Sequence, residues 1–279
     1  MQDNTGKILR ALRKYHGINQ IEFAQLLDCN QSTLSRIEMG VLELTAMQWL
    51  NLVERYHLDA RCITTGKIEQ LDPIKFNLKK SPKYGSFKKM PKRYDTLRGS
   101  TVRSVYPFLK FISHKLGEEK KNELLTSLKL DPDYFVIQNL PISILAIQDI
   151  FLAIEEKGLI SIDNYQEILN HNDISDTHSF FLDSLKVSSA GEVAFKKLTK
   201  FVASHFEINS NYEFIGDKNC FVKATNQSFL KELKLDDTFE KFRSLYNLSH
   251  FDKLAPLLKW DGSFKLNNLN DGWEIACAT

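Results

Sequence analysis

The first seventy residues show a helical period of apolar side chains that is interrupted at short intervals, and this pattern restricts the segment to an all-α fold. Gly17 and Gly40 follow two of the apolar runs, where a residue able to take positive φ ends a helix. The runs predict helices over 6–16, 20–27, 31–38 and 45–56, with a short fifth element up to residue 66. The sequence therefore predicts five short helices in one unit.

Two asparagines mark where helices begin. Asn19 precedes the second predicted helix, and Glu22 lies three residues further on, as in a capping box. Asn30 is an N-cap for the third helix. The apolar positions of these helices are Ile8, Leu9, Leu12, Tyr15, Ile21, Phe23, Ala24, Leu27, Leu34, Ile37, Met47, Leu50, Leu52 and Val53. We expect them to form the core of the unit.

This succession resembles the Cro and phage-repressor type of helix-turn-helix, the Xre family, over residues 5–66. The residues that carry the resemblance are Arg13, Gly17, Asn19, Gln20, Phe23, Ala24, Leu27 and the run from Asn30 to Gly40. The resemblance implies a lambda-repressor-like domain of five helices that binds double-stranded DNA. It also implies an ion pair between Arg13 and Glu38, which as an exposed pair would contribute under about 1 kcal/mol.

The third predicted helix would read the DNA bases. Arg36 has the chemistry to hold a guanine and Gln31 an adenine, and each such contact discriminates by about 1–3 kcal/mol. The resemblance implies that Gln20 binds a backbone phosphate and that Gln31, Ser32 and Arg36 face bases. The predicted DNA-binding residues are Gln20, Asn30, Gln31, Ser32, Thr33, Ser35 and Arg36. The alternative is a helix face that is polar only because solvent covers it.

Positive charge is concentrated in one segment. Residues 71–103 carry ten basic and two acidic side chains and three of the seven prolines, although the whole chain has a net charge of only +2. This composition predicts an extended basic linker. Its residues Lys88, Lys89, Lys92 and Arg93 would either contact DNA phosphates or only keep the linker solvated. The predicted division is therefore a DNA-binding domain over 1–70, this linker, and a second domain over 104–279.

Residues 104–279 predict an α+β domain, mostly helical with a small antiparallel sheet. Helical spacing is clear over 105–116, 118–128, 142–157, 164–171, 189–206, 229–235 and 239–258. Alternating residues at 212–215 and 220–224, and again at 263–268 and 273–276, flank turn residues and predict two hairpins. The segments 130–133 and 141–143 faintly resemble the start of the N-terminal region of certain AraC-type regulators. This supports a sensor or dimerisation domain.

Motifs for catalysis and for cofactors are absent from the sequence. There is no phosphate-binding loop, no glycine-rich dinucleotide turn, and no nucleophile elbow, so we expect no enzyme and no cofactor. The four cysteines are scattered, which fits a reduced compartment. The densest group of metal-binding side chains is His171, Asp173, Asp176 and His178. A polar loop explains that group better than a metal site does, so we predict no metal.

These observations predict a sequence-specific transcriptional regulator. It would bind operator DNA as a homodimer, because one reading helix covers few bases. The second domain would sense a small-molecule or protein ligand, or dimerise. The alternative is a scaffold protein that uses the helix-turn-helix as a docking module. No membrane span is evident, so a cytoplasmic, nucleoid-associated protein is expected.

Overall fold

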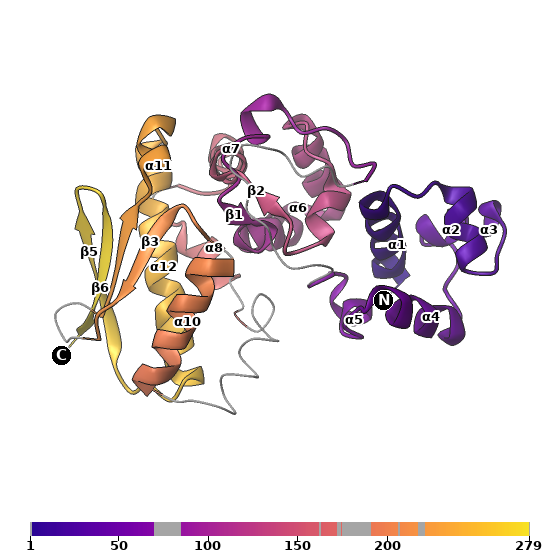
Figure 1. Cartoon of the computed structure of the whole chain (residues 1–279). Helices are drawn as coiled ribbons and strands as arrows, with labels where there is room; N and C mark the ends of the chain where they lie inside the picture. Colours follow the sequence, from indigo (N-terminus) through magenta and orange to yellow (C-terminus); the bar gives the residue numbers. More distant parts are fainter. Residues whose placement is uncertain are drawn as a thin grey trace.

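The protein is mostly helical, with two small antiparallel sheets. Figure 1 shows the N-terminal helices at one end, the larger sheet at the opposite end, and α6 and α7 between them. The computed structural model describes residues 2–69, 85–161, 163–171, 174, 191–205, 207–216 and 221–278. The α+β class expected for the C-terminal part is confirmed in this general form.

Five helices occupy the N-terminal segment. Their bounds are α1 Gln2–His16, α2 Gln20–Leu26, α3 Gln31–Glu38, α4 Ala46–Tyr56 and α5 Cys62–Thr65. Asn19 caps α2 in a reciprocal capping box with Glu22. Asn30 caps α3, because its side chain accepts the backbone N–H of Thr33 at 2.8 Å. These caps satisfy backbone donors that the first turn of a helix leaves without partners.

The buried face of α4 agrees only in part with the one that the sequence predicts. Met47 and Leu50 are 65% and 61% exposed, so their predicted burial is wrong. The face that packs into the core carries Leu52, with Trp49 and Val53 half-buried beside it. Leu52 and Val53 belong to the predicted apolar set, whereas Trp49 does not. Trp49, Leu52 and Val53 follow helical spacing, and tertiary packing turns the face that they form toward the core. Ile21 of α2 is also exposed.

The described part of the basic segment, from residue 85 onward, packs against the rest of the molecule. The backbone N–H of Ser86 donates to the carbonyl of Lys14 at 2.7 Å. Met90 is buried, and so is Tyr94, whose hydroxyl donates to Asp149 at 2.7 Å. These side chains give the segment something to bury despite its charge. Residues 71–84 of the predicted linker lie outside the described residues.

Helices and short 3-10 turns make up the middle of the chain. They are η1 Lys92–Tyr94, η2 Val102–Val105, α6 Tyr106–Ser127, η3 Pro132–Val136, α7 Ile144–Glu156 and α8 Gln166–Asn170. Gly117 interrupts α6 with φ 86° and ψ 166°, which matches the boundary predicted there. The small sheet pairs β1 (Ser100–Thr101) with β2 (Pro141–Ile142). Pro141 therefore lies in a strand instead of a first helical turn, and Ser143 caps α7.

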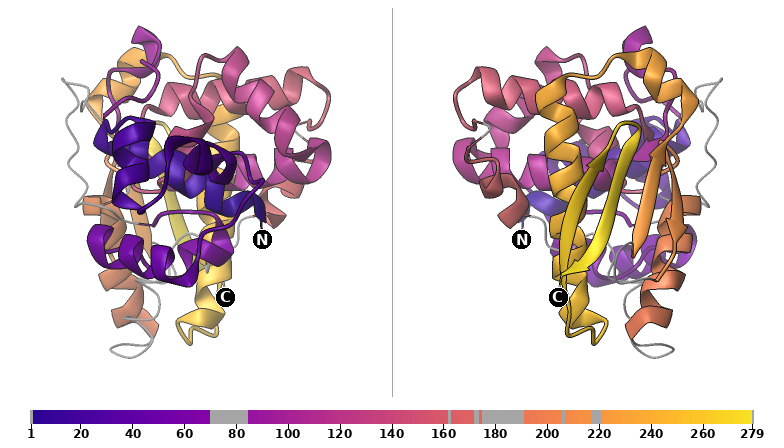
Figure 2. Two further views of the ribbon diagram at one scale, coloured as in Figure 1. Left: turned by 90° about the vertical axis from the view of Figure 1, so that its right-hand side faces the viewer. Right: turned by 90° about the vertical axis from the view of Figure 1, so that its left-hand side faces the viewer.

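The C-terminal part forms a four-stranded antiparallel sheet with helices on one face. The strands are β3 Ser210–Phe214, β4 Val222–Asn226, β5 Ser263–Leu269 and β6 Gly272–Ala278, in the order β3-β4-β6-β5. The helices are α10 Gly191–His205, α11 Ser228–Leu233 and α12 Asp237–Leu257. In the right-hand view of Figure 2, the sheet lies in front of α12 and α10. Both predicted hairpins form.

Two clusters of buried apolar residues hold the molecule together. One extends from Ile8 in α1 through α6 and α7 to Phe242 in α12, and it includes Met90, Tyr94 and Val102 of the basic segment. The other lies between α10, α12 and the sheet, around Phe195 and Trp273. The first cluster joins the N-terminal helices to the middle of the chain, and the contact between them frames a pocket.

Candidate functional site

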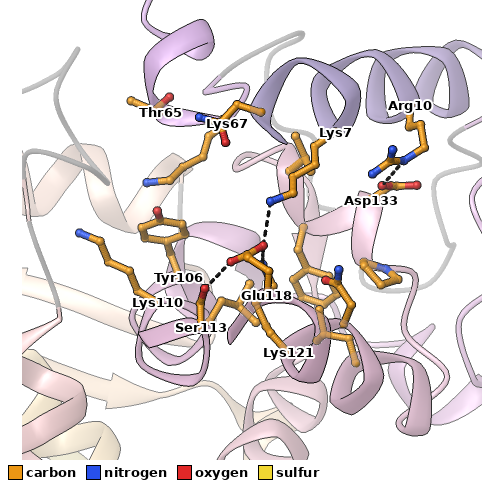
Figure 3. A pocket seen from close by; sticks show the side chains of 18 of the residues that line it. Lys7, Arg10, Thr65, Lys67, Tyr106, Lys110, Ser113, Glu118, Lys121 and Asp133 are labelled. Carbon is orange, nitrogen blue, oxygen red and sulfur yellow. Dashed lines mark hydrogen bonds and ion pairs between the residues drawn. The ribbon is translucent and has the colours of Figure 1, made fainter. Parts of the chain in front are cut away.

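A pocket of about 360 Å³ lies where the N-terminal helices meet α6 and η3. Figure 3 shows its side chains converging from α1, from the end of α5 and from α6. Its polar and charged lining residues include Asn4, Lys7, Arg10, Thr65, Lys67, Tyr106, Lys110, Ser113, His114, Glu118, Lys121, Asn122 and Asp133. We call it the basic junction pocket.

Positive charge dominates this pocket. Its cations are Lys7, Arg10, Lys67, Lys110 and Lys121. Among the residues that the structure describes, two carboxylates, Glu118 and Asp133, line it, so the described lining has an excess of three positive charges. A concave site with one sign of charge concentrates field lines and raises the local concentration of the opposite ion. The pocket is therefore suited to an anion.

Glu118 is the centre of the ion pairs in the pocket. Its carboxylate accepts hydrogen bonds from Lys7 Nζ at 2.8 Å, from Lys121 Nζ at 2.6 Å, and from the hydroxyl of Ser113. Burial alone would raise the pKa of Glu118, but these hydrogen bonds outweigh burial and hold the pKa at about 2. Glu118 therefore stays ionised and keeps two ammonium groups oriented.

Lys67 and Lys110 approach the same aromatic ring. Nζ of Lys67 lies 3.2 Å from the centroid of Tyr106, and Nζ of Lys110 lies 6.0 Å from it. Both distances are within cation–π range. Lys67 is only 6% exposed, so its position is fixed by packing. Gly66, with φ +69°, ends α5 and turns the chain so that Lys67 enters the pocket.

Helical spacing explains how the pocket is assembled. Asn4, Lys7 and Arg10 lie three residues apart on one face of α1, and Nε of Arg10 contacts Oδ1 of Asp133 at 3.2 Å. The α6 residues of the pocket follow the same period. This site was not predicted from the sequence, because residues near positions 7, 67 and 118 meet only in the folded chain. The spacing on α1 was its one visible signal.

The predicted DNA-binding residues lie on α2, on α3 and at the N-terminus of α3. Gln31, Ser32 and Arg36 are exposed, whereas Thr33 and Ser35 are half-buried. The amide of Gln31 donates to Gln20 Oε1 at 2.7 Å, and the amide of Gln20 donates to Glu38 at 2.8 Å. The side chain of Asn30 is occupied by capping, as described above. The structure brings the predicted DNA-binding residues together on α2 and α3, and Gln31 and Gln20 are hydrogen-bonded to each other.

Arg13 and Glu38 form a two-pronged ion pair. Nε of Arg13 lies 2.8 Å from Oε1 of Glu38, and its second terminal nitrogen donates to Oε2 at 3.1 Å. Glu38 is 4% exposed. The resemblance predicts an exposed pair that contributes under about 1 kcal/mol, whereas the carboxylate of Glu38 is buried in the structure. Removal of one partner from a buried pair costs more, about 3–5 kcal/mol.

The four predicted phosphate-contacting residues, Lys88, Lys89, Lys92 and Arg93, are exposed. Arg93 binds Asp149 at 2.9 Å, and the backbone N–H of Lys88 donates to Asp131 at 3.1 Å. They lie along the surface of the packed segment and outside the lining of the basic junction pocket.

Asp173, Asp176 and His178 of the candidate metal group lie outside the described residues, and His171 contacts the carbonyl of Glu167 at 2.7 Å. Within the described ranges, no group of three or more metal-binding side chains occurs. None of the described helices is long and apolar enough to cross a membrane.

Comparisons with known proteins find little that resembles this chain. No family model and no curated protein matches it. One solved structure, from work titled "Modulating Heme Redox Potential Through Protein-Induced Porphyrin Distortion", has 14% identity and a TM-score of 0.41, over 63% of this chain and 96% of the other. A second, a variant of an H-NOX protein, has 13% identity and a TM-score of 0.42, over 64% of this chain and 95% of the other.

These comparisons contradict the prediction of a DNA-binding, repressor-like transcriptional regulator with double-stranded DNA as its partner. The titles of the matched structures name heme and H-NOX, and neither title names DNA binding. The scaffold alternative belongs to the same overturned prediction, and the expected homodimer loses the DNA half-sites on which it was based. The TM-scores are too low to transfer heme binding to this chain.

Proposed function

We propose that the protein binds a small, multiply charged anion, such as a phosphorylated metabolite, in the basic junction pocket. The observation that carries this proposal is the convergence of five cationic side chains, against two carboxylates, on one cavity of about 360 Å³. That volume lies within the range of small-molecule sites, about 300–1,000 Å³. Lysine ammonium groups are compact point charges, and they suit the charge of a phosphate group. The proposed role is binding and not catalysis.

A bound anion would rearrange the ion pairs of the pocket. Lys7 and Lys121 already contact Glu118, so an entering anion shares these ammonium groups with that carboxylate. It also comes close to Lys67 and Lys110 on the opposite wall (Figure 3). Because Lys7 comes from α1 and Lys121 from α6, the anion would strengthen the contact between the N-terminal helices and the middle of the chain.

Isothermal titration calorimetry of the full chain with inorganic pyrophosphate and with AMP tests this proposal, with adenosine as the uncharged comparison. Lys110→Gln removes a cation of the pocket. Lys120→Gln is its matched control, because Lys120 lies on the same helix, pairs with Glu123, and does not line the pocket. One charge-assisted hydrogen bond contributes about 1.5–3 kcal/mol, so we expect Lys110→Gln to weaken binding about tenfold or more.

The control variant should bind within about twofold of the wild type. Binding of adenosine as tightly as AMP would overturn the anion assignment. Equal losses in the two variants would show that the anions respond only to the overall charge of the surface.

We also propose that residues 2–66 adopt the five-helix, repressor-type arrangement, as a statement on fold alone. The order and length of α1 to α5, the caps at Asn19 and Asn30, and the contact of Arg13 with Glu38 support it. An experimental structure in which α2 and α3 packed on α1 in another order would overturn this proposal.

A further inference from the structure

A second cavity, of about 110 Å³, lies between η2, α6, α7, α12 and the start of β3. One face of α12 forms its longest wall. The residues of that wall follow helical spacing, and they are Phe239, Phe242, Arg243, Tyr246, Asn247 and His250. We call it the α12 cavity. It shares no lining residue with the basic junction pocket.

One half of the α12 cavity is apolar. Ile144 and Ile147 of α7 are 2% and 5% exposed and face the cavity from one side. The rings of Phe108 and Phe242 lie 5.2 Å apart, centroid to centroid, and Tyr246 lies 6.1 Å from Phe242. These side chains give a hydrocarbon or aromatic body a closely packed, water-poor surface.

The other half carries charged groups held in place by hydrogen bonds. Arg103 is 7% exposed and donates to the backbone carbonyl of Glu69 at 2.8 Å. Glu207 accepts hydrogen bonds from the Ser100 hydroxyl at 2.7 Å and from the backbone N–H of Asn209 at 3.0 Å. Burial lowers the pKa of Arg103 to about 10 and raises the pKa of Glu207. Because these hydrogen bonds hold both side chains, Arg103 and Glu207 are positioned before any ligand enters.

Arg243 adds a second guanidinium to the lining. It binds Glu240 at 2.9 Å and Asn226 at 2.6 Å, and Glu240 balances its charge. Arg103 is the deeper of the two cations, and its planar fork matches the geometry of a carboxylate. A carboxylate in the cavity would add a counter-charge beside this buried guanidinium, which lowers the cost of its burial.

We infer that the α12 cavity is a second ligand site, which takes a small monocarboxylate with an apolar body, such as an aromatic or short-chain acid. The apolar body packs against Phe108, Ile147 and Phe242, and the carboxylate faces Arg103. The site takes only a small ligand, because its volume is about 110 Å³, against about 360 Å³ for the basic junction pocket. The site differs from the basic junction pocket in both size and polarity.

A titration of the full wild-type chain tests this inference directly. The isoleucine methyl groups are labelled for NMR, and benzoate or hexanoate is added. We expect saturable shifts of the Ile144 and Ile147 methyls and none of Ile8 or Ile37, which lie in α1 and α3. Benzyl alcohol and hexanol, which have similar bodies without the charge, should bind at least tenfold more weakly.

A variant that fills the cavity gives a second test. Ile147→Trp should weaken benzoate binding more than tenfold, whereas Glu156→Trp, at an exposed position of the same helix, should change it less than twofold. Unshifted Ile144 and Ile147 methyls in the wild type would overturn the site. Alcohols that bind as tightly as the acids would overturn the carboxylate assignment. The wild-type titration decides the question even if Ile147→Trp does not fold.

Discussion

His250 illustrates how burial acts on a single titratable group in this chain. It lies on the face of α12 that lines the α12 cavity, with its ring 6.4 Å from that of Tyr246. Burial, with a smaller effect from the positive charge of Lys253, lowers the pKa of His250 to about 4. The imidazole is therefore neutral in the folded protein at physiological pH, and folding opposes its protonation.

This shift predicts a pH-dependent loss of stability. The unfolded chain takes up the proton near pH 6.5, so stability linked to His250 is complete above that pH and falls until about pH 4. The total loss is roughly 3 kcal/mol. Urea unfolding of the wild type and of His250→Gln over this range measures it, since Glu207 in the same cavity is present in both proteins. Parallel pH profiles of the two proteins would contradict the prediction.

At the scale of the element, α6 shows how one residue divides a helix. Gly117 takes φ 86° and ψ 166°, a conformation that is essentially restricted to glycine. The break lets the half of α6 that begins at Glu118 change direction. Glu118 and Lys121 can then face the basic junction pocket while Leu124 and Leu125 enter the core.

Substitution of this glycine should destabilise the fold through the backbone alone. A Cβ at Gly117 or at Gly158 would meet no atom within 4 Å, so neither substitution causes a steric clash. We expect Gly117→Ala to lower the free energy of unfolding by about 2 kcal/mol. Gly158→Ala, in the milder left-handed region at φ +67°, should cost about 1 kcal/mol. Urea denaturation compares the two, and equal losses would contradict this account.

Elements were easier to predict from the sequence than their contacts. Capping residues such as Asn19, the break at Gly117, and the hairpin turns act over a few residues, so the sequence shows them directly. Met47 and Leu50 are exposed because the face of α4 that packs inward is selected by the neighbouring elements and not by the helix itself. Both cavities combine residues that are far apart along the chain, so no local pattern identifies them. The DNA-binding function predicted from α3 was wrong. That prediction relied on one local pattern, and a local pattern does not show which distant residues meet in the folded chain.

At the scale of the whole molecule, ion pairs connect α1 to the middle of the chain. Lys14 contacts Asp131 at 2.9 Å and Asp133 at 2.8 Å, while Lys7 contacts Glu118. Asp131 is 2% exposed, so this is a buried carboxylate whose charge needs a partner. These pairs lie next to the apolar cluster that continues from α1 into α6.

Removal of Lys14 should therefore loosen a large part of the structure. We expect Lys14→Met to destabilise the protein by about 3 kcal/mol, because it leaves the Asp131 charge buried. Hydrogen exchange should rise in both α1 and η3. Lys120→Met, which breaks only the exposed pair with Glu123, should leave the free energy of unfolding close to that of the wild type. Faster exchange confined to α1 would show that the two parts are not coupled through this contact.

The backbone links around residues 68 and 86 determine where the chain can be cut. Ile68 pairs with Ile137 in a parallel bridge, and Ser86 donates to the last turn of α1. A recombinant fragment that stops at residue 70 would carry one half of the bridge without its partner and would leave the carbonyl of Lys14 without the N–H of Ser86. Dissection into separately expressed pieces should therefore keep α1 together with residues up to η3, and a truncation study that ignores this would measure lost packing instead of lost function.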